Sequence, residues 1–210
     1  MLALAVTFTG LTLVPALGEL LKRRLDLSGE LPRKLVHITG ALAAAALPFV
    51  LSFREIAVLG LVFALGMALS ARLRLLTAIH EITRRSYGEI LFPLGVAALA
   101  LCSPSRAGFV FALLVLGLAD GLAGLVGGRY GRRRVPLGTG RKSVVGSATF
   151  FAVTLAAVTG TLLVAGRASP TALAAGLGIA LALTIAELLL GYGFDNLLLP
   201  LLAGLALSVA

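Results

Sequence analysis

Several carboxylates stand inside or at the ends of apolar segments of the chain, and three of them are candidate metal ligands. Asp120 lies within one such segment, Glu187 lies near the end of another, and Asp195 opens a third. Charged side chains inside apolar spans are costly, so they mark candidate functional sites. Carboxylates of this kind can hold Mg²⁺, which takes a few protein oxygens together with phosphate oxygens. We therefore expect Asp120, Asp195 and Glu187 to be metal ligands.

A basic, glycine-rich loop at residues 128–143 offers the complementary chemistry for phosphate. Arginine and lysine neutralise phosphates, and Lys142-Ser143 stands at the start of an apolar run, where the dipole of a helix favours an anion. The combination of carboxylates, cations and glycines suits phosphoryl or nucleotidyl transfer to a lipid. The candidate phosphate-binding residues on this ground are Arg129, Arg141, Lys142, Ser143 and Gly146.

These residues also have a purely structural interpretation. The cations of loop 128–143 could serve only to set topology and to contact anionic lipids. Glycine pairs such as Gly117/Gly121 have the spacing of close helix packing, and His37 could make only an interhelical hydrogen bond. Asp120 fits this interpretation less well, because the sequence has no cation within one helical turn of it and a carboxylate at that depth needs a metal or a partner.

The elements that must position these residues are apolar helices. The chain has 210 residues, of which 59% are hydrophobic and 13% are charged, and its mean hydropathy is +1.06. A soluble domain carries about 25% charged residues, so this composition excludes a soluble globular protein, and it also excludes a disordered chain. The apolar runs are too long for barrel strands and do not alternate. The sequence therefore predicts an all-α, polytopic transmembrane helix bundle.

About eight apolar runs follow one another along the chain. We expect them to form a single integral membrane domain over residues 1–210, with an interfacial amphipathic segment at 72–89 and an irregular, basic cytoplasmic loop at 128–143. The fourth and the last run are short and contain proline, so either could be a half helix. The runs are 2–20, 35–51, 56–71, 90–102, 108–127, 144–165, 171–190 and 197–210.

The placement of positive charge predicts the orientation of the bundle. All of the 18 lysines and arginines except Arg54, Arg106 and Arg167 lie in alternate connections between the runs. Under the positive-inside rule these connections are cytoplasmic. We therefore expect both termini outside, a location in the cell (cytoplasmic) membrane, and candidate residues that face the cytoplasmic interface. The net charge of +9 is then a topology signal and does not predict nucleic-acid binding.

Three motifs, in order along the chain, resemble those of the CTP-dependent polyprenol kinase family, which comprises phytol, dolichol and farnesol kinases. The first is RKLVHITG at residues 33–40. The second, at residues 117–147, is a small-residue helix with a central Asp, a glycine-rich exit, a basic loop and the element KSVVGS. The third is Glu187 followed by Asp195-Asn196 and Pro200.

The resemblance implies a kinase that transfers a phosphoryl group from CTP, with Mg²⁺ or another divalent cation, to an isoprenoid alcohol. The alcohol would be of the phytol, geranylgeraniol, farnesol or dolichol type. Asp120 would anchor the cation together with Asp195 or Glu187, His37 is the candidate base, and Lys34 either fixes His37 or contacts phosphate. Catalytic roles are thus predicted for Asp120, Lys142, His37 and Lys34. The resemblance adds Gly128 and Ser147 to the nucleotide-binding set of Arg129, Arg141, Ser143 and Gly146.

Two other functions stay open on the sequence. The second motif also resembles that of phosphatidate cytidylyltransferases, which form a CDP-lipid. A lipid or solute transporter is the other alternative, although its polar groups would be spread through the membrane depth. The expected partners are an isoprenoid alcohol, a nucleoside triphosphate and the lipid bilayer. The sequence leaves the oligomeric state open, including a homodimer.

Overall fold

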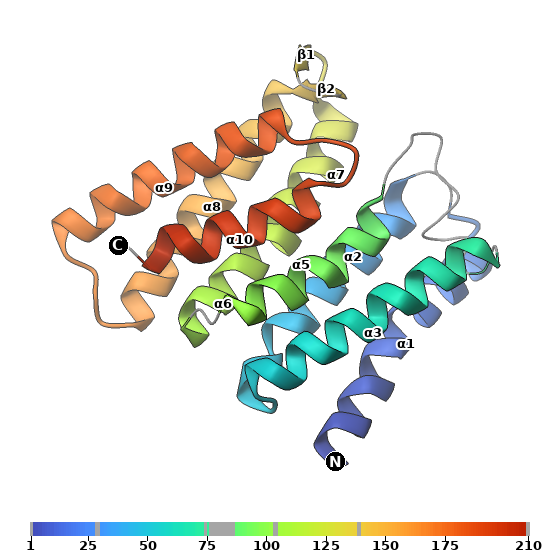
Figure 1. Cartoon of the computed structure of the whole chain (residues 1–210). Helices are drawn as coiled ribbons and strands as arrows, with labels where there is room; N and C mark the ends of the chain where they lie inside the picture. Colours follow the sequence, from blue (N-terminus) through green and yellow to red (C-terminus); the bar gives the residue numbers. More distant parts are fainter. Residues whose placement is uncertain are drawn as a thin grey trace.

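Helices make up nearly all of the computed structural model, which describes residues 2–27, 30–73, 75, 87–102, 105–137 and 140–208 (Figure 1). Each predicted apolar run coincides largely with helix, because leucine and alanine favour helix and backbone groups in lipid must be hydrogen-bonded within their own segment. The elements are α1 (Leu2–Arg24), α2 (Glu30–Ala45), η1 (Leu47–Phe49), α3 (Phe53–Arg72), α5 (Gly88–Leu101), α6 (Arg106–Leu114), η2 (Val115–Asp120), α7 (Gly121–Tyr130), β1 (Arg134–Leu137), β2 (Gly140–Ser143), α8 (Val144–Val164), α9 (Pro170–Leu189) and α10 (Asp195–Ser208).

Serine caps define where several helices begin. Ser52 accepts a hydrogen bond from the backbone N–H of Glu55, whose carboxylate accepts one from the N–H of Ser52, so α3 starts with a complete capping box. A serine side chain likewise caps α6, α8 and α9. These caps satisfy N–H groups that the first helical turn leaves without a partner.

Among the described residues, five helical segments are long and apolar enough to cross a membrane. They are Leu2–Arg24, Phe53–Arg72, Arg106–Tyr130, Val144–Val164 and Pro170–Leu189, whereas α5 and α10 are shorter apolar helices. The chain is therefore a helical membrane protein, as the composition predicts. The count of about eight spans and the placement of both termini outside stay predictions.

The segment made of α6, η2 and α7 is the centre of the bundle. It has 61% of its most apolar window buried within the protein, against 11% for α1. Phe109, Phe111 and Leu116 are fully buried and pack into one core with residues of α5, α8 and α10. Side chains on this segment are therefore the ones most shielded from both lipid and water.

One end of the bundle carries the polar elements. In Figure 1 the ends of α7 and α9 and the starts of α8 and α10 lie near the β1–β2 hairpin at the top, whereas the end of α1 and the start of α2 lie further to the right. Both chain ends lie at the opposite end. This arrangement places the basic residues that precede α2 and α8 at the same end of the molecule.

The basic loop differs from the irregular segment predicted at 128–143. Helix α7 continues to Tyr130, and β1 then pairs with β2 in antiparallel register, with Val135 opposite Lys142. Val135 and Leu137 alternate with Arg134 and Pro136, which is a short strand pattern. The many arginines and glycines around it favour an irregular loop instead, so the sequence does not predict this hairpin. In the predicted interfacial segment 72–89, residues 74 and 76–86 lie outside the described residues.

Two exposed arginines at opposite ends of the bundle allow a matched test of orientation. We expect Arg167→Cys, in a Cys102→Ser background, to react with a membrane-impermeant maleimide in intact cells. Arg132→Cys, in the same background, should react only after permeabilisation, because the basic end is predicted to be cytoplasmic. Equal labelling of the two variants in intact cells would contradict the predicted topology.

Candidate active site

A π-helical turn places Asp120 at the heart of the bundle. The six residues of η2 interrupt the helix that begins at Arg106 and resumes at Gly121, and Asp120 closes this turn. Such turns are rare and often occur at functional sites. The Asp120 side chain is only 9% exposed, so its charge requires a partner in its immediate surroundings.

Lys34 of α2 is that partner. Its Nζ donates to Asp120 Oδ2 at 2.7 Å and to the backbone carbonyl of Asp120 at 3.3 Å. Lys34 is itself buried and passes over Gly124, where an added Cβ would lie 2.5 Å from the lysine Cε. Glycine at position 124 therefore leaves the space through which Lys34 reaches the carboxylate.

His37 lies one turn further along α2 and joins the same cluster. Its Nε2 lies 2.9 Å from the carbonyl oxygen of Leu116 and 3.5 Å from Asp120 Oδ2. A carbonyl can only accept, so Nε2 carries a proton and the lone pair of the neutral ring is on Nδ1. The ring also packs edge-on against Phe92, with a centroid distance of 5.3 Å. These contacts fix both the orientation and the tautomer of the imidazole.

A second ion pair lies close to the first. Lys142 of β2 pairs with Glu187 near the end of α9, and Glu187 is buried whereas Lys142 is partly exposed. Asp120 and Asp195 lie close enough to Glu187 to interact with it electrostatically, and so do Lys34 and Lys142 with Asp195. The structure thus brings together Lys34, Asp120, Lys142, Glu187 and Asp195, which the sequence predicted to share one interface.

The junction between β2 and α8 packs tightly against α7. The Ser143 hydroxyl accepts a hydrogen bond from the Gly146 N–H at 3.1 Å and so caps α8. An added Cβ on Gly127 would lie 2.5 Å from Ser143 Oγ and 3.0 Å from Gly146 Cα. In this structure the Ser143 hydroxyl and the Gly146 amide therefore hold the fold of the junction together.

The remaining predicted phosphate-binding residues lie around this junction. Arg129 is exposed and its guanidinium lies 5.7 Å from the centroid of the Tyr130 ring. Gly128 borders open space and Ser147 is half-buried. The side chain of Arg141 lies outside the described part of the chain. Their role in binding a nucleotide stays a prediction.

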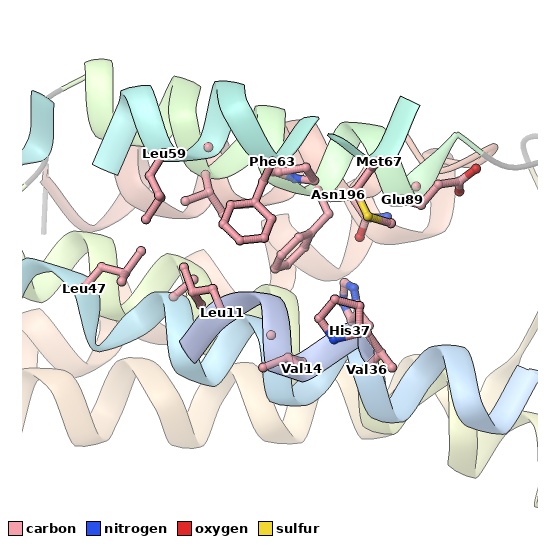
Figure 2. Close-up of a pocket in the computed structure, with 18 of the residues that line it drawn as sticks. Leu11, Val14, Val36, His37, Leu47, Leu59, Phe63, Met67, Glu89 and Asn196 are labelled. Atoms are coloured by element: carbon pink, nitrogen blue, oxygen red, sulfur yellow. The ribbon is translucent and has the colours of Figure 1, made fainter. Parts of the chain in front are cut away.

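An elongated apolar pocket adjoins the charged cluster. Figure 2 shows it between α1 and α2 on one side and α3 and α5 on the other, with Leu47 and Leu59 at one end and His37 and Glu89 at the other. Asn196 lines the polar half, and its Oδ1 is buried without a hydrogen-bond partner among the described residues. His37 is therefore shared by the charged cluster and the pocket wall.

Sequence reasoning missed this pocket and the place of Asn196 in it. The pocket is built from residues of six elements, and no motif links Leu11 of α1 or Phe63 of α3 to the site. One signal was present in the sequence: His37, Gly40 and Ala44 recur at intervals of three or four residues. They therefore lie on one face of α2.

Breaking the buried Lys34–Asp120 pair should be more harmful than replacing it. We expect Asp120→Asn to lower the free energy of unfolding by about 3–5 kcal/mol, because it leaves the Lys34 charge buried without a carboxylate. The double variant Lys34→Met/Asp120→Leu should recover most of that loss. Denaturant titration in bicelles would measure both, and a double variant less stable than Asp120→Asn would contradict a net cost of the unpaired charge.

Two neighbouring glycines allow a matched test of the α7–α8 junction. Gly127→Ala should destabilise the protein by about 1–3 kcal/mol, because the new methyl group overlaps Ser143 and the Gly146 backbone. Gly128→Ala should have no such effect, because nothing lies within 4 Å of its position. Thermal unfolding in nanodiscs would compare them, and equal midpoints would show that the contact is not tight.

No family model and no solved structure matches the chain. The sequence is similar to the phytol kinase of Synechocystis sp., with 34% identity over an alignment of 214 positions. The alignment covers 94% of this chain and 86% of that protein. The similarity thus covers nearly the whole of both chains. The chain therefore belongs to the polyprenol kinase family that includes phytol kinase.

Proposed function

We propose that the protein is a CTP-dependent kinase that phosphorylates an isoprenoid alcohol at the cytoplasmic face of the cell membrane. The kinase activity and the isoprenoid acceptor follow from its similarity to phytol kinase. The preference for CTP rests on the resemblance of its motifs to those of CTP-dependent polyprenol kinases. The cytoplasmic face rests on the distribution of lysine and arginine.

One observation carries the proposal: His37 belongs both to the buried charged cluster and to the wall of the apolar pocket. A lipid alcohol needs an apolar surface for its tail, and its hydroxyl must meet the phosphoryl donor at the edge of that surface. His37 is the residue at which these two requirements meet.

The proposed reaction requires the side chains of the site to accept one proton and to neutralise charge. The oxygen of the alcohol forms a bond to the γ-phosphorus of the nucleotide while the bond to the bridging oxygen breaks and CDP leaves. The proton of the hydroxyl passes to Nδ1 of His37, whose other nitrogen is held by the Leu116 carbonyl. Phosphoryl transfer depends mainly on positioning and on neutralising charge. Lys142, which is partly exposed beside Glu187, would contact the phosphates in this proposal.

The carboxylates of the site fit a divalent cation of the Mg²⁺ type. Glu187 Oε2 is buried without a hydrogen-bond partner among the described residues, and the charges of Asp120 and Asp195 act on this carboxylate. The described side chains contain no group of three potential ligands close enough to form a complete cage. Mg²⁺ usually takes one or two carboxylates and completes its shell with water and phosphate oxygens. Asp120, with Asp195 or Glu187, would hold the ion, which would neutralise the nucleotide phosphates.

The test is an assay of the purified protein in lipid. With CTP, Mg²⁺ and phytol or geranylgeraniol, we expect the alcohol monophosphate and CDP. Faster reaction with ATP would refute the nucleotide assignment. Pyrophosphate release with phosphatidate would identify a cytidylyltransferase instead.

The double variant Lys34→Met/Asp120→Leu separates chemistry from folding. We expect it to fold and to lose about 10³-fold or more in kcat, because the carboxylate that would carry the cation is gone. Retention of wild-type kcat by this folded variant would remove Asp120 from the mechanism.

A further inference from the structure

We propose that the apolar pocket encloses the tail of the acceptor alcohol and limits its length, with Gly40 and Ala44 as the small residues that leave space for the tail. The inference rests on the proposed kinase function and adds to it the location and the size of the acceptor site.

The two ends of the pocket differ in polarity. Its polar half contains His37 and Asn196, and its far end is closed by Leu47, Ile56 and Leu59, which are all buried. The orphan oxygen of Asn196 requires a hydrogen-bond donor. This oxygen is itself buried, so an alcohol hydroxyl would donate to it after a rotation of the Asn196 side chain toward the pocket, whereas the phosphodiester of a phospholipid and a carboxylate have no proton to donate. The polar half is therefore suited to an uncharged hydroxyl and the rest to a hydrocarbon chain.

The length of the pocket limits the chain. His37 and Leu47 are ten positions apart along α2 and η1, and Ile56 and Met67 are eleven apart along α3, so both walls extend for about 15 Å. An isoprene unit adds four backbone bonds of about 1.5 Å each, or about 5 Å in an extended zigzag. The pocket therefore holds about three isoprene units. An acceptor of the farnesol size fills it, the last unit of a phytol-sized tail extends beyond it, and a dolichol tail is far too long to be enclosed.

Gly40 sets the width at the first turn beyond His37. An added Cβ at this position would meet only the Phe92 ring, at 3.8 Å. A larger side chain would therefore project beside Phe92 across the pocket without displacing backbone. Ala44 lies one turn deeper on the same face of α2. A larger side chain at position 40 or at position 44 should block the tail after about one or about two isoprene units, respectively.

The experiment compares alcohols of increasing length on three variants. For Gly40→Leu we expect the ratio of kcat/KM for dimethylallyl alcohol to that for geranylgeraniol to rise at least about tenfold. For Ala44→Leu we expect the ratio of kcat/KM for geraniol to that for geranylgeraniol to rise in the same way. Gly66→Leu is the matched control, because Gly66 lies on α3 with nothing within 4 Å and outside the pocket. Its length profile should equal that of the wild type.

An unchanged length profile in both Gly40→Leu and Ala44→Leu would overturn the proposal. A second measurement does not depend on turnover: a farnesol analogue with a terminal diazirine should crosslink to peptides that contain Leu47 or Leu59, and Ala44→Leu should abolish this. Crosslinks confined to α8 and α9 would also overturn it. A wild type that phosphorylates no alcohol, yet crosslinks at Leu47 or Leu59, would refute the proposed function while leaving the tail site in place.

Discussion

A carboxylate buried in a bundle of apolar helices must be neutralised where it lies, and the architecture of this protein follows from that requirement. Asp120 can reach Lys34 only because α2 packs directly on the central helix and because Gly124 leaves room for the lysine stem. An unpaired charge at this depth would cost several kcal/mol. The approach of α2 therefore cannot vary without loss of stability. The same approach brings His37 to Asp120 and so determines where the imidazole lies.

In the proposed reaction, the charged cluster and the apolar pocket would bind substrates that arrive from different phases. A lipid acceptor diffuses in the bilayer, whereas a nucleotide arrives from water. The pocket lies between α1, α2, α3 and α5, and the second ion pair joins β2 to α9. Helix α2 supplies Lys34 to the charged cluster and His37 to both the cluster and the pocket wall. In the proposed function, this one helix would determine where the two substrates meet.

Much of this could be predicted from the sequence, and the failures have physical causes. The apolar runs locate the helices because membrane thickness dictates their length. The motifs with Lys34, Asp120 and Glu187 indicate a shared interface because the alternating charge of the loops assigns the ends of these helices to the same side of the membrane. Neither signal states which helices touch. The ion pair of Lys34 with Asp120 joins residues 86 positions apart, and the pocket depends on the packing of six elements, so both required the structure. The β1–β2 hairpin was missed because its strands are short.

The π-turn at Val115–Asp120 makes the central helix sensitive to changes in length. Each residue added to or removed from a helix rotates everything beyond it by about 100°. Deleting one residue here would turn either Asp120 away from Lys34 or the glycine face of α7 away from α8. Membrane helices commonly absorb a change of length by tilting, but tilt cannot correct a rotation. Homologous chains should therefore differ at this helix by substitution alone, whereas insertions and deletions accumulate in the connections.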